Sequence, residues 1–323
     1  MNRQSIKKVS AVSGMLFLLI FLLRNPLESL DASRDGMKLW LNTLLPTLLP
    51  FLILTGILVR TNVIEKILSP LNKFWRIILG LSPSGAYVFI FGMLCGYPMG
   101  VKLASDLFYN NKISRREAEY LFTFANQPSP VFLTTYLAHI CFDKRVPVKE
   151  ILWIFFLADI VCMMFFRFIV FHNNTCTGNI PDIPNIKNVS KKETSTASSP
   201  GSIIDVSIMN GFETITRLGG YILLFSLISA CVRHYWKWSP QICSLFLGAL
   251  EITTGLHQIA LSGLPFEIQY PVTMGLAAFG GFCIMAQTKS VADKQLSFLP
   301  CISAKFLNSA LTVLLVLIFS KVI

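Results

Sequence analysis

Long apolar segments recur along this chain, and they restrict its fold more than any other feature. A segment of about 20 apolar residues can cross a lipid bilayer as a helix. Of the 323 residues, 53% are hydrophobic and only 14% are charged, whereas a soluble domain carries about a quarter charged residues. The sequence therefore predicts an all-α polytopic membrane protein. The apolar segments span residues 9–23, 39–59, 85–104, 129–142, 150–171, 218–232, 240–260, 270–287 and 299–320.

The sequence CGYPMG at residues 95–100 interrupts one of these segments. Glycine and proline are poor helix residues, and Pro98 also lacks a backbone donor. Hydrocarbon tolerates an unpaired backbone group only where protein or a water-filled cavity covers it. The interruption therefore predicts a broken or re-entrant helix whose backbone faces a ligand. The alternative is a proline kink where two helices cross.

Three further interruptions carry polar side chains. FANQPSPVF at 124–132 combines two prolines with amides and a hydroxyl. GALEITTGL at 248–256 places a carboxyl in an apolar run, and such a costly group is a functional candidate. AAFGGFCIMAQTKS at 277–290 contains a glycine pair followed by a glutamine. The candidate substrate-binding residues at the four interruptions are Gly96, Tyr97, Pro98, Gly100, Asn126, Gln127, Ser129, Glu251, Thr253, Thr254, Gly280, Gly281 and Gln287.

A helix that stops inside the membrane exposes N–H groups at one end and C=O groups at the other. The N–H end attracts a carboxylate or phosphate, and the C=O end coordinates Na⁺ or a proton donor. These interruptions predict a polar small-molecule substrate, no cofactor, and Na⁺ or H⁺ as candidate coupling ions. Two structural alternatives stay open: Glu251 paired with Arg233 or Lys237 at the interface, and small-residue packing at Gly280 and Gly281.

Charge and cysteine spacing argue against other classes of protein. The net charge of +11 comes from basic residues scattered between apolar segments, a pattern typical of loops that flank membrane spans rather than of a nucleic-acid site. The eight cysteines form no CxxC pair and the four histidines no HExxH motif, so no metal site is predicted. We also find no nucleophile–base pair and no phosphate loop, and therefore predict no enzyme. The expected partners are a small molecule and the lipid bilayer, with no nucleic acid. The sequence does not decide whether the protein forms an oligomer.

The chain divides into four parts. Residues 1–24 form an uncleaved anchor helix, and 25–171 form a first membrane repeat. Residues 172–202 lack apolar periodicity and predict a flexible polar linker. A second membrane repeat follows at 203–323. In the first repeat, 63–79 is amphipathic, which fits an interfacial helix or a short helix packed on the bundle.

The two repeats align without gaps at two offsets. Residues 36–60 match 209–233 at an offset of 173. Further along, an offset of 155 places Gly100 opposite Gly255 and Phe124 opposite Phe279. Interrupted segments at matching positions of two repeats indicate a transporter binding site. Chance similarity between apolar segments is the alternative.

Five motifs in order resemble a known family. They are GYPMG-x-K-x-x-x-D (96–106), S-x-x-E-A-E (114–119), F-x-N followed by Ser129-Pro130 (124–130), LEIT-x-G (250–255) and FGG-x-x-x-x-AQ (279–287). Together they resemble the sporulation integral membrane protein YlbJ family, which carries the nucleoside-recognition, or Gate, domain. The resemblance covers nearly the whole chain after the first helix.

The resemblance implies a multi-pass protein of an endospore-forming bacterium, in the cell membrane that becomes the outer forespore membrane. It implies transport of dipicolinic acid, a flat dianion, across that membrane during sporulation. The Gate domain is also similar to concentrative nucleoside transporters, which implies inverted repeats with re-entrant hairpins. The alternatives are a nucleoside transporter or sensor and a spore-membrane assembly protein that transports nothing.

Overall fold

A computed structural model describes residues 3–61, 68–172 and 200–319 of the chain. Helices account for most of these residues, and none of the described residues forms a β-strand, which confirms the predicted all-α class. In chain order the elements are α1 (Arg3–Arg24), α2 (Pro26–Leu39), η1 (Trp40–Leu44), α3 (Leu45–Thr61), η2 (Ser69–Leu71), α5 (Asn72–Phe74), η3 (Trp75–Leu79), α6 (Pro83–Cys95), α7 (Met99–Tyr109), α8 (Arg115–Leu121), η4 (Phe132–Cys141), α9 (Val148–Phe165), η5 (Phe166–Val170), α10 (Pro200–Tyr235), α11 (Pro240–Leu250), α12 (Ile252–Leu261), α13 (Phe266–Phe279), α14 (Gly281–Val291) and α15 (Leu299–Phe319).

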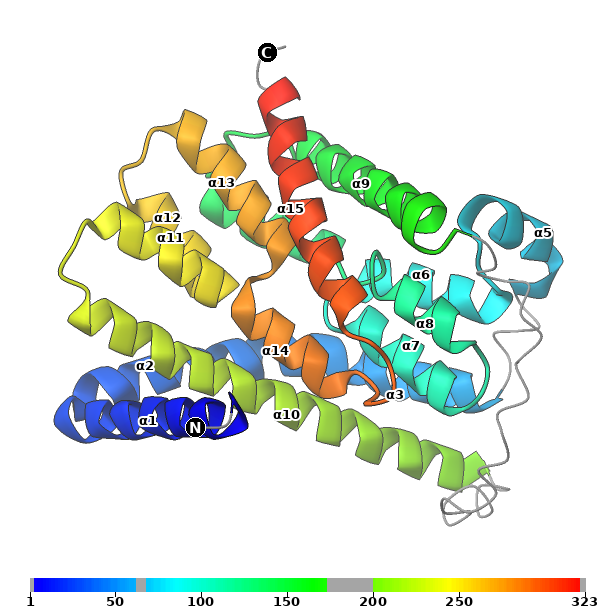
Figure 1. The fold of residues 1–323 in the computed structure, drawn as a ribbon, viewed down its shortest axis with the longest axis horizontal. Helices are drawn as coiled ribbons and strands as arrows, with labels where there is room; N and C mark the ends of the chain where they lie inside the picture. Colours follow the sequence, from blue (N-terminus) through cyan, green and yellow to red (C-terminus); the bar gives the residue numbers. More distant parts are fainter. Residues whose placement is uncertain (1–2, 62–67, 173–199, 320–323) are drawn as a thin grey trace.

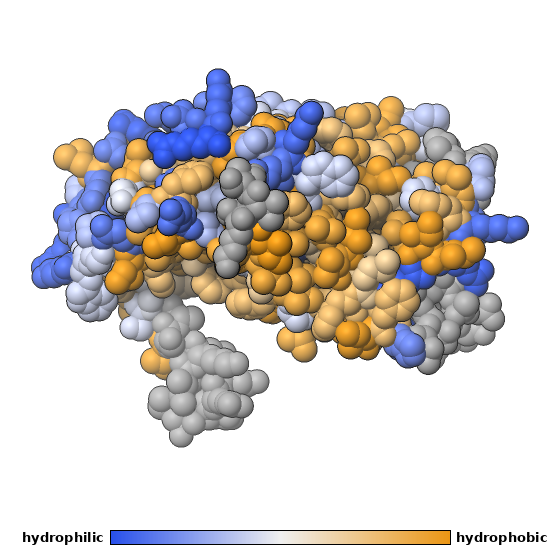
Figure 2. All heavy atoms as spheres, turned by 90° about the horizontal axis from the view of Figure 1, so that it is seen from above, coloured by the Kyte–Doolittle hydropathy of each residue, from blue (hydrophilic) through white to orange (hydrophobic). Residues whose placement is uncertain are grey.

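Within the described residues, five helical runs are long and apolar enough to cross a membrane: Pro26–Thr61, Val148–Val170, Pro200–Tyr235, Phe266–Val291 and Leu299–Phe319. The bent pair formed by Asn72–Leu79, which is α5 with η3, and by α6 would make a sixth. Figure 2 shows hydrophobic side chains over the broad middle of one face and hydrophilic ones gathered toward its margins. Such a surface suits lipid contact, because lipid replaces water as the solvent of the apolar band.

The longest helix, α10, packs along α2 and α3, and α1 lies beside them (Figure 1). Phe21 of α1 is fully buried in a cluster with Ala32 of α2 and Ala230 of α10. The apolar part of α1, Val12–Arg24, is shorter than the five candidate spans. The anchor role of residues 1–24 stays a prediction.

Two predicted segments fall partly outside the described residues. Of the predicted linker 172–202, residues 173–199 are not described, and α10 already begins at Pro200. Of the amphipathic segment 63–79, the described part after residue 67 forms three short helical turns rather than one α-helix.

The C-terminal helix α15 joins two hydrophobic clusters. Cys301 and Ala304 near its start belong to a cluster built mainly from α6, α7 and α8. Val316 near its end belongs to a cluster of η4, α9, α12 and α13. α15 therefore packs against both clusters, one near its start and the other near its end.

Glycines allow two helix pairs to fold back on themselves. In the α6–α7 pair, a Cβ on Gly92 would lie 3.0 Å from the Cα of Gly100. In the α11–α12 pair, a Cβ on Gly255 would lie 2.2 Å from the Cα of Gly248. Each pair is therefore a helical hairpin whose two arms touch through backbone, as expected for small residues at helix contacts in membranes.

Replacing Gly100 with alanine should destabilise the protein strongly. A Cβ at this position would lie 1.6 Å from the carbonyl oxygen of Ala125, so the backbone would have to move. We expect a loss of about 1–3 kcal/mol, seen as a lower melting temperature in detergent. The matched control is Gly220→Ala on α10, where a Cβ has nothing within 4 Å. Equal melting temperatures for the two variants would contradict the close packing.

Candidate functional site

The first predicted interruption separates α6 from α7. Gly96 has a φ of +80°, and the following Tyr97–Pro98 peptide is cis. The backbone N–H of Tyr97 donates to the carbonyl oxygen of Gln127 at 2.9 Å. A Cβ on Gly96 would lie 2.6 Å from the backbone nitrogen of Ser129. The tip of this hairpin therefore lies directly on the second interruption.

The second interruption is a stretch without regular helix between α8 and η4, residues 122–129. Asn126 and Gln127 are both buried there. Ser129 acts locally, because its hydroxyl accepts from the backbone N–H of Phe132 at 3.2 Å. Asn126 and Gln127 are thus the amide side chains that this buried stretch places inside the bundle.

The third interruption is Glu251, which lies in an extended conformation between α11 and α12. Its carboxylate accepts from the backbone N–H groups of Thr253 at 3.0 Å and Thr254 at 2.8 Å. The Thr253 hydroxyl donates to the same carboxylate at 2.8 Å. This is an N-cap with the favourable charge for a helix start. The buried carboxylate therefore has a structural role, and no ion pair with Arg233 or Lys237 forms among the described residues.

The fourth interruption is the glycine pair between α13 and α14. Gly280 and Gly281 have φ angles of +86° and +75°, which favour glycine. A Cβ on Gly281 would lie 3.2 Å from the carbonyl oxygen of Ala249, beside the third interruption. A Cβ on Gly280 would lie 3.8 Å from the ring of Tyr97, at the first one. The structure therefore brings all four interruptions together.

Lys305 of α15 lies where these segments meet, and its side chain is buried. Its Nζ donates to the carbonyl oxygen of Asn126, and it lies 3.4 Å from both Gln127 Oε1 and the carbonyl oxygen of Ala278. It also lies 5.1 Å from the centroid of the Tyr97 ring. One ammonium group thus contacts the first and second interruptions and the end of α13.

A second buried charge lies one turn along α15. Asp159 of α9 accepts from the side-chain amide of Asn308 at 2.5 Å, and Asn308 accepts from the hydroxyl of Thr312 at 3.2 Å. All three side chains are buried. Because Lys305, Asn308 and Thr312 are spaced three and four residues apart, they share one face of α15. That face is a polar stripe between the two halves of the chain.

Some buried polar atoms near this stripe have no hydrogen-bond partner among the described residues. They include the hydroxyl of Tyr97, Oδ1 of Asn126 and the hydroxyl of Thr273. Buried polar atoms are normally paired, so an unpaired one in a native structure needs an explanation. A bound polar ligand would provide the missing partners for the first two atoms.

A cavity of about 360 Å³ adjoins the same place. The second interruption contributes Gln127 and Pro128 to its lining, and α9 contributes Trp153, Phe156 and Asp159. Gln127 therefore lies between this cavity and Lys305. Mostly apolar walls with a few polar groups are typical of small-molecule sites.

The remaining predicted residues lie at the edge of this centre or outside it. Gln287 donates to the sulfur of Cys283 within α14 at 3.2 Å. The carbonyl oxygen of Thr253 accepts from the hydroxyl of Tyr136, which joins α12 to η4. Pro98 precedes α7, and Gly100 packs on the second interruption. These residues hold the segments together rather than reaching Lys305.

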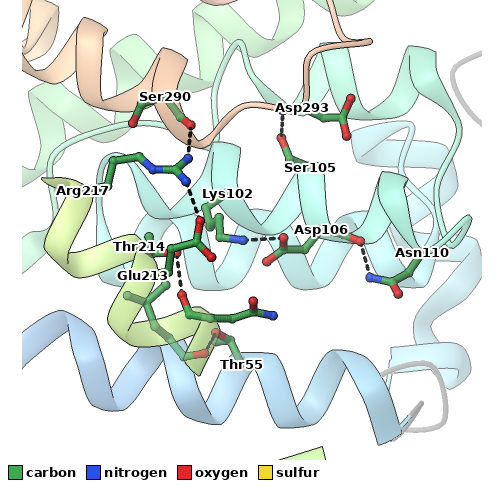
Figure 3. A network of polar contacts seen from close by, with 12 residues as sticks. Thr55, Lys102, Ser105, Asp106, Asn110, Glu213, Thr214, Arg217, Ser290 and Asp293 are labelled. Atoms are coloured by element: carbon green, nitrogen blue, oxygen red, sulfur yellow. Dashed lines mark hydrogen bonds and ion pairs between the residues drawn. The ribbon is translucent and has the colours of Figure 1, made fainter. Parts of the chain in front are cut away.

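The K-x-x-x-D part of the first motif forms a separate network (Figure 3). Lys102 and Asp106 make an ion pair on α7 at 2.5 Å. Between them, the hydroxyl of Ser105 accepts from the backbone N–H of Asp293 at 3.0 Å. The two motif residues therefore pair within α7, and Ser105 between them ties α7 to the turn after α14.

Sequence reasoning missed Lys305 and Asp159. Each is an ionisable residue within an apolar segment, and that rule had singled out Glu251. Applied to residues 299–320 and 150–171 as well, it would have identified both. The rule finds ionisable residues inside apolar segments, but it does not separate those with a structural role from those that bind a ligand.

These features define a multi-pass helical membrane protein with a polar centre made by broken helices. No family model and no solved structure matches the chain. The chain is 24% identical to the sporulation integral membrane protein YlbJ of Bacillus subtilis (strain 168). The alignment covers 99% of this chain and 85% of that protein. It confirms the relation to the YlbJ family that the five motifs indicated.

The N-cap role of Glu251 can be tested by substitution. Glu251→Ala leaves two N–H groups unpaired and should cost about 0.5–2 kcal/mol, measured as a lower melting temperature in detergent. Glu251→Asn keeps a capping oxygen and should cost less. Thr254→Ala is the control, because it retains the backbone donor. A loss with asparagine as large as that with alanine would argue against capping.

Proposed function

We propose that this protein is a membrane transporter for a small polar aromatic metabolite, foremost dipicolinic acid moved across the outer forespore membrane during sporulation. The observation that carries the proposal is the buried ammonium of Lys305 among four interrupted segments. The name of the relative supports the link to sporulation. The transported compound and the membrane are proposals of ours.

A flat dianion suits the chemistry of this centre. The Lys305 ammonium is buried, and charges interact more strongly in a buried site than in water, so a carboxylate placed nearby gains from its positive charge. The unpaired hydroxyl of Tyr97 can donate to a second carboxylate oxygen. Tyr97 and Phe132 lie with ring centroids 6.4 Å apart, and Phe132 stacks on Tyr136 at 5.1 Å. These rings offer faces for an aromatic ligand.

The spacing of the interruptions supports two repeats similar to those of concentrative nucleoside transporters. Gly96 and Glu251 end the first arms of the two hairpins, and 251 − 96 = 155. At the same offset, Asn126 within the second interruption lies opposite Gly281 in the fourth. This is the offset at which the halves align. Inverted repeats with a site at their junction would follow from it.

A nucleoside is the second candidate ligand. Buried amides such as Asn126, whose Oδ1 is unpaired, can bond the edge of a nucleobase. A neutral nucleoside adds no negative charge for Lys305 beyond that of Asp159, which is why we favour the carboxylate. A spore-membrane assembly protein without a ligand is the third candidate.

The test is ligand-dependent thermal stabilisation of the purified protein in detergent. The ligands are dipicolinate, isophthalate, which lacks the ring nitrogen, and a set of nucleosides. A ligand at 100 times its Kd should stabilise the folded state by about 2.7 kcal/mol. We expect dipicolinate to raise the melting temperature of the wild type, and Lys305→Met and Asn126→Ala to lose that shift.

Lys294→Met is the matched control, because Lys294 is an exposed lysine in the turn before α15. It should keep the full shift. Stabilisation by nucleosides alone would replace the carboxylate with the second candidate. A wild type that no ligand stabilises would favour the assembly protein.

A further inference from the structure

The oxygen atoms around Lys305 resemble the shell of a bound cation. Its Nζ faces two main-chain carbonyl oxygens, of Asn126 and Ala278, and the amide oxygen of Gln127. Neutral oxygens of this kind are ligands for hard cations such as Ca²⁺. In transporters, unwound carbonyls and half-helix C-terminal ends coordinate Na⁺. Three acceptors also match the three donors of an ammonium group.

Both carbonyl groups are available because helices end there. Asn126 lies in the stretch without regular helix, and Ala278 lies in the last turn of α13. The last carbonyls of a helix lack intrahelical partners and carry partial negative charge. A cation at this point satisfies oxygens that would otherwise be buried and unpaired, at considerable cost.

The groups in direct contact with the Lys305 ammonium are neutral oxygens and a ring, while Asp159 attracts it electrostatically without forming an ion pair among the described residues. Asp159 is bonded to Asn308, and the Glu251 carboxylate caps α12. The ring of Tyr97 lies on another side of the ammonium, an arrangement that favours a cation. The position of the positive charge is therefore fixed by neutral partners.

We infer that the Lys305 ammonium occupies the place of a coordinated alkali cation, so that the polar centre is held together without Na⁺. Lys305 comes from α15 and bridges the second interruption to the end of α13. It thus links the two halves as a bound ion would. One consequence, that ligand binding requires no Na⁺, rests on the proposed transport function. The placement of the Lys305 ammonium in a cation shell does not rest on it.

The experiment compares melting temperatures of detergent-solubilised wild type and Lys305→Ala in sodium, methylammonium and choline chloride at equal ionic strength. We expect the wild type to melt at the same temperature in all three salts. Lys305→Ala should melt at least about 4 °C lower in choline. Sodium or methylammonium should restore part of that loss, because a small cation can enter the vacated shell. Lys294→Ala is the control and should behave as the wild type in every salt.

A wild type that sodium stabilises over choline would overturn the inference, since the native shell would then still take an ion. Lys305→Ala that is equally stable in all three salts would overturn it too. Should Lys305→Ala fail to fold without sodium, the yield of folded protein purified in sodium and in choline provides the same comparison. If it folds in neither salt, the melting temperatures of the wild type in the three salts decide the question. No transported ligand is present, so the result is independent of dipicolinate binding.

Discussion

The structure depends on the requirement that each backbone polar group inside a membrane find a partner within the protein. A continuous helix meets this requirement locally, and an interrupted helix does not. Here neighbouring segments provide the missing hydrogen-bond partners. The backbone N–H of Tyr97 donates to the carbonyl oxygen of Gln127, and Lys305 of α15 donates to that of Asn126. Glu251 accepts from the start of its own helix. The first and second interruptions therefore lie together because neither is satisfied alone.

The same requirement distinguishes Glu251, whose charge has a structural role, from Lys305, whose charge can attract a ligand. The Glu251 carboxylate is engaged by three donors in the first turn of α12, which leaves it little capacity for a substrate. Lys305 contacts neutral oxygens and a ring, so its charge has no direct neutralising partner. The unpaired hydroxyl of Tyr97, which can donate to an anion, lies in the same region. A ligand that is anionic and aromatic would complement this set.

The helical class and the places where helices break were predictable, because both follow from local composition. Glycine and proline stop a helix wherever they fall, and α6 and α13 end at the glycines that the sequence singled out. The role of Glu251 was harder to predict. Ser, Thr, Asp and Asn are the usual N-caps, and a glutamate in an apolar run more often indicates a functional site.

The sequence by itself determined the membrane class and the interruptions, since each depends on residues close together in the chain. Only the tertiary structure decided which polar partner each buried charge contacts. Lys305 and Asn126 are 179 residues apart, and Asp159 and Asn308 are 149 apart. No periodicity encodes such pairs. They form because α15 lies between the two hydrophobic clusters and presents its polar face to both halves.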